Sequence, residues 1–447
     1  MTRCIVTLAA LAALLAAAGP AAGATAPGAG TAWPGGTAVV SYASRGALAR
    51  ALEREPALVA RRLPALRMAV LRPRGDLDRF ATALAAQPGI VRVERALPRR
   101  SLVEPGLLPG PAGPPFQWQH AAIRADLVPA EVAAAASGLT IAVIDTGADL
   151  RAPDLAAKSP VAYSVRSRTA DVSDRNGHGT FVAALAAGSA SNGDGIAGVA
   201  ADARLMIVQA GGASGAFTDV EEAAAIVYAV DHGARVLNLS LGGPTTSTVE
   251  RRAIVYAASR GALLVAAVGN SAAFGSPIEY PAALLQPVGS RGAGGIGLAV
   301  AASDRSGRHA SFSSTGSHVS LAAPGDGVFS AVSTRSSTTR YPRTALPGSL
   351  TGLYGFGSGT SFAAPQVAGA AALVWAANPS LRAAEVARVL EATASGHGTW
   401  SASLGYGVVD VAAAVAEAQR LAEEVRAGSS PATVPPRPAA ASPSRAE

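Results

Sequence analysis

Five short apolar segments, separated by helical stretches, constrain the fold of this 447-residue chain more than any other feature. They are LTIAVID (139–145), LMIVQA (205–210), VLNLSL (236–241), ALLVAAV (262–268) and GIGLAVAA (295–302). Each segment is apolar on both faces of a strand, which is typical of parallel strands that helices cover on both sides. The sequence therefore predicts an α/β fold with a doubly wound, mostly parallel sheet over residues 117–420.

A smaller α+β unit is predicted ahead of this sheet, within residues 25–103. TAVVSYA (37–43), RMAVLRP (67–73) and GIVRVERA (89–96) are expected to be strands, whereas RGALARALEREPALVARR (45–62) and DLDRFATALAA (76–86) have a helical period. The Pro- and Gly-rich stretch SLVEPGLLPGPAGPP (101–115) follows. Such a composition predicts an extended connection, so we expect a linker over residues 104–116.

The two ends of the chain have compositions of their own. Residues 1–24 place Arg3 before an apolar run and end in Ala22-Gly23-Ala24, the pattern of a secretory signal peptide. A retained anchor is the alternative, although the run is shorter than the roughly 20 residues that span a bilayer. Residues 421–447 are rich in Pro, Ala and Ser, which predicts a disordered tail. We therefore expect a secreted protein, extracellular or periplasmic. Its single cysteine, Cys4, would be removed with the signal peptide, so the mature protein would have no disulfide.

The charge of the chain argues against a nucleic-acid partner. The net charge is +7, but residues 25–103 alone contain 13 Arg against 5 Asp and Glu, so the predicted main domain is not basic. A nucleic-acid-binding domain is expected to keep a basic face of its own.

Three polar residues stand where elements of the predicted sheet begin or end. Asp145 closes the strand LTIAVID, His178 lies in NGHGT at the start of a helix, and Ser361 lies in GTSFAAP at the start of another. Taken singly, Asp145 is open to interpretation as a turn residue, and His178 and Ser361 as polar groups at a helix start. Together they match serine hydrolysis, in which an imidazole activates a hydroxyl and a carboxylate orients the imidazole.

The motifs VIDTG, NGHGT and GTSFAAP, in that order, resemble those of the subtilisin-like serine peptidases. The resemblance runs from about residue 117 to about residue 415. It implies a subtilisin-like fold in which Asp145 orients, His178 acts as general base and acid, and Ser361 is the nucleophile. Asn270, at the end of LLVAAVGN, matches the family's oxyanion asparagine; a plain turn residue is the alternative.

The same resemblance predicts a cleft that binds the substrate as an added β-strand. Ser240, Leu241 and Gly242 would form one wall, and residues 211–215 the other. Asn176 would border the pocket next to the scissile bond. Glu279, in SPIEYPAA, would lie at the floor of the pocket for the residue before the cut and favour Arg or Lys there; a solvent-facing Glu279 is the alternative.

Residues 25–103 resemble the family's propeptide, which acts as an intramolecular chaperone and inhibitor. The unit departs from that pattern because its middle offers one clear strand where the family's fold has two. Its end, PRRSLV (98–103), would lie in the active site like a product. Self-cleavage is expected near Arg99-Arg100, with a cut after Leu102 as the alternative.

The sequence also departs from the family at two packing positions and leaves the question of metal open. Phe181 replaces a common His and Phe362 a common Met, and both positions accept apolar side chains. No cofactor is required and no metal is assigned. A structural calcium through Asp154 and residues 192–194 is a further option, since calcium prefers such oxygen ligands, but the loop could simply turn.

The resulting hypothesis is a monomeric secreted serine endopeptidase, made as a self-processing zymogen, that acts on proteins or peptides and is inhibited by its own propeptide. It would bind no nucleic acid and, once the signal is removed, no membrane. The rival hypotheses are a peptide-binding pseudo-protease and an acyl transferase on the same scaffold.

Overall fold

The computed structural model describes residues 36–102, 116–192, 195–336, 341, 343–344 and 353–428. The predicted signal peptide, almost all of the predicted linker and the last part of the predicted tail lie outside these ranges. The sequence predicts a disordered tail from residue 421, and this boundary is wrong because helix α13 (Val411–Arg426) continues beyond it.

A seven-stranded parallel sheet is the centre of the molecule, with the strand order β14-β13-β12-β10-β6-β8-β7. Its strands are β6 (Thr140–Asp145), β7 (Val161–Ser164), β8 (Arg204–Gln209), β10 (Val236–Leu239), β12 (Leu263–Ala267), β13 (Gly297–Ser303) and β14 (Leu321–Pro324). The five predicted strands are all present, and the sheet gains β7 and β14 at its two edges. The predicted doubly wound α/β fold is confirmed.

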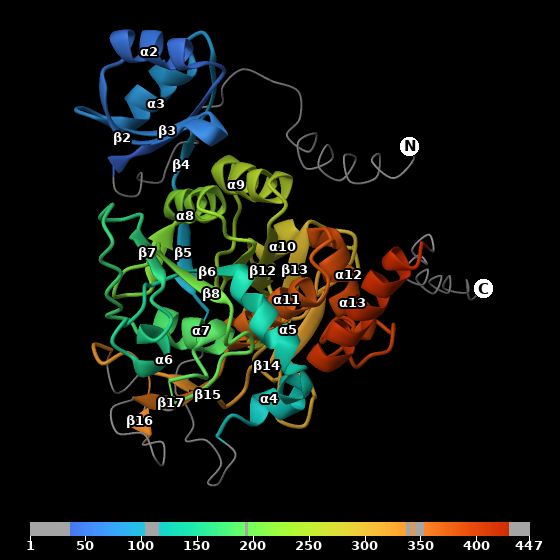
Figure 1. The fold of residues 1–447 in the computed structure, drawn as a ribbon. Helices are drawn as coiled ribbons and strands as arrows, with labels where there is room; N and C mark the ends of the chain where they lie inside the picture. Colours follow the sequence, from blue (N-terminus) through green and yellow to red (C-terminus); the bar gives the residue numbers. More distant parts are fainter. Residues whose placement is uncertain are drawn as a thin grey trace.

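Helices cover both faces of this sheet. α8 (Asp219–Asp231) and α9 (Thr248–Ser259) lie on the face toward the N-terminal unit, whereas α7 (His178–Ala187) and α11 (Thr360–Ala377) pack together on the other face (Figure 1). The remaining helices are α4 (Trp118–Ala122), α5 (Ala130–Ala135), α6 (Pro153–Ala156), α10 (Ala282–Leu285), α12 (Ala383–Thr393) and α13, with short 3-10 turns η3 (Ala125–Leu127), η4 (Ala136–Gly138) and η5 (Ala272–Phe274).

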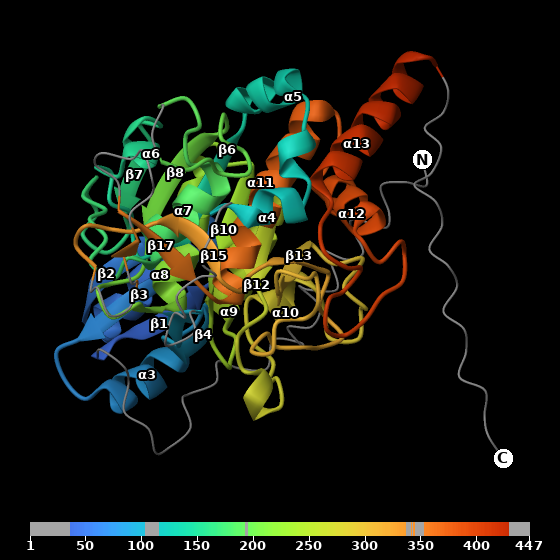
Figure 2. The same ribbon diagram turned by 90° about the horizontal axis from the view of Figure 1, so that it is seen from below.

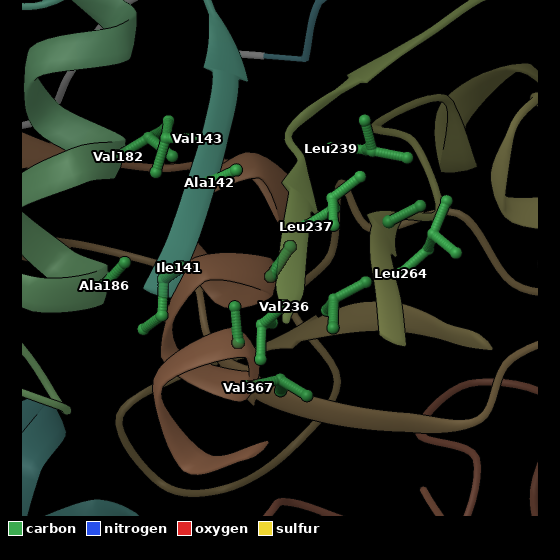
Figure 3. Packing of buried hydrophobic residues seen from close by; sticks show 14 of the residues in the cluster. Ile141, Ala142, Val143, Val182, Ala186, Val236, Leu237, Leu239, Leu264 and Val367 are labelled. Atoms are coloured by element: carbon green, nitrogen blue, oxygen red, sulfur yellow. The ribbon is translucent and has the colours of Figure 1, made fainter. Parts of the chain in front are cut away.

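The core between the sheet and the helices α7 and α11 is built from small aliphatic side chains. Figure 3 shows Val182 and Ala186 of α7 beside β6, and Val367 of α11 beside Val236 of β10. Every residue of α7 is buried, which explains why this helix lacks a polar face. Burying a Val or Leu side chain contributes about 1.5–3 kcal/mol, so this layer fixes the positions from which His178 and Ser361 project.

The N-terminal unit is a four-stranded antiparallel sheet with the order β2-β3-β1-β4. Its elements are β1 (Ala38–Tyr42), α2 (Arg45–Arg54), β2 (Ala57–Leu63), η2 (Pro64–Leu66), β3 (Met68–Pro73), α3 (Leu77–Ala85) and β4 (Ile90–Arg95). The helix predicted over residues 45–62 is therefore wrong in its second half. Pro56 disfavours helix at the residue before it, and the chain turns there into β2, the second middle strand that the sequence did not reveal.

The two faces of the N-terminal sheet have different partners. Val40 and Leu71 pack under α2 and α3 in a separate small core, whereas Val39 and Met68 belong to the main core, on the side of α8 and α9. Arg252 of α9 also donates to the carbonyl of Leu66, at 3.0 Å. The unit is thus docked on the main domain, as the view in Figure 2 also shows from below.

The last strand of the N-terminal unit enters the main domain. β5 (Pro98–Ser101) lies between β11 (Leu241–Gly242) and β9 (Ala216–Thr218) and pairs antiparallel with both. A further small sheet of β15 (Val328–Ala331), β17 (Tyr354–Gly357) and β16 (Arg343–Thr344) packs beside α7.

Candidate active site

Asp145 and His178 form a buried hydrogen-bonded pair. Asp145 is the last residue of β6 and His178 the first residue of α7. The Nδ1 atom of His178 lies 2.7 Å from Oδ1 and 2.9 Å from Oδ2 of Asp145. The carboxylate therefore holds the proton on Nδ1 and leaves Nε2, which makes no hydrogen bond to any described atom, as the free basic nitrogen.

Glycine at two positions lets α7 approach the end of β6 this closely. A Cβ atom on Gly179 would lie 2.1 Å from the carbonyl oxygen of Gly147, far inside contact distance. Gly147 itself has a φ of 108°, which favours glycine, and its own Cβ would lie 2.1 Å from the oxygen of Val172. The glycines that follow Asp145 and His178 in the sequence are thus what allows the two side chains to meet.

Asp174 is a buried carboxylate that the sequence did not single out. Its Oδ1 accepts from the Thr146 hydroxyl at 3.0 Å and from Gly177 N at 2.8 Å, and its Oδ2 accepts from Thr180 N at 2.9 Å. It thereby ties the loop after Asp145 to the first turn of α7. The sequence offers one signal for this role: Asp174 lies two residues before Asn176 of NGHGT, a spacing at which an Asp side chain can accept from the backbone in an Asx turn.

Ser361 lies in the first turn of α11 and exchanges hydrogen bonds with Ser240. The Ser361 hydroxyl donates to the Ser240 carbonyl at 3.1 Å, and the Ser240 hydroxyl donates to the Ser361 carbonyl at 2.8 Å. The second bond has a simple cause: Pro365, four residues on, has no N–H to donate to that carbonyl. The hydroxyl of Ser361 is therefore turned toward Ser240, and the described residues show no hydrogen bond between it and His178.

Asn270 lies three residues after the end of β12, and Thr360 orients its amide group. Its Oδ1 accepts from Thr360 N at 2.9 Å and from the Thr360 hydroxyl at 2.8 Å. Its Nδ2 is buried and has no hydrogen-bond partner among the described residues. A buried donor of this kind is costly unless a ligand or a reaction intermediate pairs with it.

β5 lies between the two segments predicted as the walls of the cleft and pairs with β11 in one wall and with β9 directly after the other. Gly242 pairs with Arg100 and Leu241 with Ser101, so the register continues with Ser240 opposite Leu102. Because Ser240 is bonded to Ser361, the end of β5 lies next to the serine. Leu102 is buried, and its Cδ1 is 3.0 Å from where a Cβ on Gly242 would stand. The predicted wall of residues 240–242 thus carries a peptide strand here.

The other residues predicted for the cleft also adjoin this strand. Asn176 donates to the Ala213 carbonyl at 3.0 Å, which joins the His178 loop to residues 211–215. A Cβ on Gly215 would lie 3.1 Å from Asn176 Nδ2 and 3.4 Å from the hydroxyl of Ser101. Gly215 therefore contacts the strand at Ser101, whose N–H donates to the Gly215 carbonyl at 3.1 Å, and Asn176 lies beside Gly215.

Glu279 is buried, so the solvent-facing alternative is wrong. Its Oε2 would lie 2.8 Å from a Cβ on Gly242, beside Leu102, and its Oε1 lies 3.3 Å from Arg100 Nη2 and 3.1 Å from the Ser271 hydroxyl. Burial raises the pKa of this carboxyl, and Arg100 acts in the opposite direction. Glu279 thus pairs with Arg100 of β5 and lies near Leu102, the residue opposite Ser240.

Asp154, the residue named for a possible calcium site, is held by hydrogen bonds from the described residues around it. Both oxygens of this buried carboxylate accept hydrogen bonds, from Asn192 at 3.1 Å, from Ile196 N at 3.1 Å and from the Tyr354 hydroxyl at 3.0 Å. Gly193 and Asp194 lie outside the described residues. Within the described part of the chain, no three His, Cys, Asp or Glu side chains come together as a metal cluster.

Phe181 and Phe362, the two departures from the expected motifs, pack against each other. Their ring centroids are 4.3 Å apart, and both side chains are fully buried. The Phe362 ring also lies 5.7 Å from the imidazole of His178. The two rings fill the space under the Asp145–His178 pair with apolar surface.

The fold and this site together define an α/β protein with a buried carboxylate–imidazole pair, a helix-borne serine and a cleft for an added strand. A model of the subtilase family matches residues 136–407, more than half of the chain. The chain therefore belongs to the subtilase family.

Individual relatives agree with this assignment. A thermophilic serine proteinase of Bacillus sp. (strain AK1) is 37% identical over 273 residues, which make up 60% of this chain and 60% of that protein. The chain thus spans less than two thirds of that relative. Thermitase of Thermoactinomyces vulgaris is 36% identical over 267 residues, 59% of this chain and 85% of thermitase.

A solved structure shows the same fold. Fervidolysin from Fervidobacterium pennivorans, described as a keratinolytic enzyme related to subtilisin, matches with a TM-score of 0.72 and 27% identity. The match covers 85% of this chain and 61% of that chain. No helix in the described ranges is both long and apolar enough to cross a membrane.

Proposed function

We propose that this protein is a secreted serine endopeptidase that is made as a self-processing zymogen. Asp145, His178 and Ser361 form its catalytic triad, and Asn270 donates to the oxyanion. The signal peptide comprises residues 1–24, and the propeptide runs from residue 25 to Leu102, one residue short of the predicted boundary at 103. The mature enzyme works as a monomer on proteins or peptides and needs no cofactor.

The observation that carries this proposal is the Asp145–His178 pair with its unpartnered Nε2. In the proposed reaction, the Ser361 hydroxyl rotates from the Ser240 carbonyl to Nε2 and attacks the carbonyl carbon of the substrate. Its proton passes to Nε2 and then to the leaving amine, which yields an acyl-enzyme ester. Water, deprotonated by the same imidazole, hydrolyses the ester and restores the serine.

Asn270 supports the same chemistry as a donor to the substrate's carbonyl oxygen. Because Thr360 holds its amide oxygen, its Nδ2 is preorganised as a donor before any charge develops. Preorganised donors of this type stabilise the tetrahedral oxyanion more than the neutral ground state, and so raise the rate.

The position of β5 supports the zymogen part of the proposal. A strand that pairs with both walls of the cleft excludes a substrate that would bind in the same way. Since Leu102 is the residue opposite Ser240, we propose that the self-cut falls between Leu102 and Val103. This alternative to a cut near Arg99-Arg100 also implies an apolar residue before the scissile bond.

A covalent fluorophosphonate probe tests the function directly. We expect the purified full-length chain to be labelled after it has processed itself, and the Ser361→Ala chain to remain unlabelled. Ser259→Ala, at the exposed end of α9, is the matched control and should label like wild type. A wild-type chain that takes no label would support the pseudo-protease instead. Mass spectrometry of peptide products separates hydrolysis from acyl transfer.

A further inference from the structure

Arg99 of β5 is buried in an acidic pocket between two helices of the main domain. Its Nε lies 2.9 Å from Oε2 of Glu222 on α8, and its Nη2 lies 2.8 Å from Oε2 of Glu250 on α9. All three side chains have an exposed fraction of 0%. A fully buried arginine is uncommon, and here it is matched by two carboxylates on two different elements.

The main domain leaves space for the aliphatic part of the Arg99 side chain as well as pairing with its guanidinium. A Cβ on Gly243 would lie 3.0 Å from Arg99 Nη1 and 3.4 Å from its Cδ, so any other residue at 243 would crowd the side chain. The third nitrogen, Nη1, donates to the carbonyl of Pro98 at 2.9 Å, a backbone group that any peptide bound in this register would supply. The pocket therefore accommodates the whole guanidinium.

The carboxyls of the pocket are poorly solvated. Burial, reinforced by Glu250, raises the pKa of Glu222 well above its usual range, although Arg99 opposes this. Burial also raises the pKa of Asp219, at the start of α8, to about 6. Asp219 bonds the backbone N–H of Leu97 at 2.7 Å and so flanks the same strand. Carboxylates held this far from water are stabilised when a cation pairs with them.

We propose that this pocket of Glu222, Glu250 and Gly243 is a substrate subsite that selects arginine four residues before the cut, counting Leu102 as the first. The inference rests on the proposed function, because it requires that substrates take the place of β5 between β11 and β9. Once β5 leaves, the two carboxylates face an empty strand position in the same register. A substrate arginine there regains the ion pairs that Arg99 made.

The test uses the protein expressed as the full chain and allowed to process itself. The substrates are internally quenched peptides with the sequence of residues 97–106. Only the residue at the position of Arg99 varies, between arginine, its neutral isostere citrulline, and leucine. We expect kcat/KM to be roughly 10- to 100-fold higher with arginine than with citrulline, as charge-assisted buried hydrogen bonds imply. Citrulline at the position of Arg100, whose side chain is 62% exposed, should change kcat/KM by less than about threefold.

Variants assign the preference to the pocket. Glu222→Gln and Glu250→Gln should each bring the arginine-to-citrulline ratio down toward one. Glu221→Gln, the neighbour that pairs with Arg166 on the exposed side of α8, should leave the ratio as in wild type. Both kcat/KM values of a ratio are measured on one preparation, so the fraction of active enzyme cancels from the ratio. If a variant does not fold, the wild-type peptide series still shows whether arginine is preferred.

Two outcomes would overturn the inference, and they are distinguishable. If the wild-type chain takes the fluorophosphonate label and cleaves arginine and citrulline peptides equally well, the pocket serves only to hold the N-terminal unit, and the proposed function stands. If the chain neither labels nor cleaves any peptide of the series, the proposed function is wrong and the subsite falls with it.

Discussion

The Ser361 hydroxyl donates to the carbonyl of Ser240, and the Ser240 hydroxyl donates back to the carbonyl of Ser361, at 3.1 Å and 2.8 Å. The helix that carries the proposed nucleophile is thereby joined to the strand that pairs with the peptide in the cleft. Because that strand also sets the register of β5, the same pair places Leu102, the residue opposite Ser240, beside the proposed nucleophile.

Asn270→Asp should keep the structure and lose turnover. The aspartate retains an oxygen that can accept from Thr360, but it removes the unpartnered Nδ2 donor. We expect kcat to fall about 10²–10³-fold, the loss typical of an oxyanion donor, with KM changed only a few-fold because the bond forms in the transition state. Steady-state kinetics on one peptide measures both. A rise in KM with kcat intact would instead make Asn270 a ground-state contact.

Gly242→Ala should narrow the pocket for the residue before the cut. The added Cβ would lie 2.8 Å from Glu279 Oε2 and 3.0 Å from the Leu102 Cδ1 position. We expect the ratio of kcat/KM for peptides with leucine and with alanine before the cut to fall roughly tenfold, the effect of about one or two methyl groups in an apolar pocket. Gly138→Ala, where an added Cβ meets nothing within 4 Å, is the control. An unchanged ratio in Gly242→Ala would contradict the assigned pocket.

Asp149 should make the protein sensitive to acid. Burial alone would raise the pKa of this carboxyl, but hydrogen bonds from Arg151 and Thr334 outweigh it and lower the pKa to about 2. A depressed acid pKa stabilises the fold above the ordinary value near 3.8, and this stabilisation is lost as the pH falls from about 4 toward 2.

Urea unfolding of wild type and Asp149→Asn between pH 5 and pH 2 measures this contribution. Because Arg151 is 63% exposed and solvent screens it, we expect on the order of 1–2 kcal/mol. The variant should be less stable than wild type at pH 5, and the gap should close at pH 2. A gap that stays constant over this range would mean that Asp149 does not titrate as described.

The parts of the fold that the sequence predicts are those set by local pattern and burial. The central strands are apolar on both faces, and VIDTG, NGHGT and GTSFAAP each combine an element boundary with a polar residue, so their positions follow from the chain itself. The edge strand β7 is short and partly exposed, and β14 has only four residues, so neither shows that pattern. The sequence of β2 predicts a helix, because its alternation of apolar residues and arginines is compatible with a helical period as well as with a strand.

The parts of the site that the sequence did not reveal depend on contacts between distant segments. Arg99 and Glu222 are 123 positions apart in the sequence. No local pattern around either residue predicts that the two side chains will pair. Glu222 follows a capping box at the start of α8, which explains acidic residues there without any ligand. The register that brings Leu102 opposite Ser240 likewise exists only once β5 has paired with β11.

The N-terminal sequence of the mature protein tests the central claim most directly. Wild type and Ser361→Ala are expressed in a host that lacks other proteases, and each product is analysed by N-terminal sequencing and intact mass. We predict that the main domain of wild type begins at Val103, and that Ser361→Ala keeps residues 25–102 covalently attached. A Ser361→Ala chain that matures to the same species as wild type would contradict self-processing by Ser361. A wild-type main domain that begins at Arg100 or Ser101 would contradict the register that pairs Leu102 with Ser240.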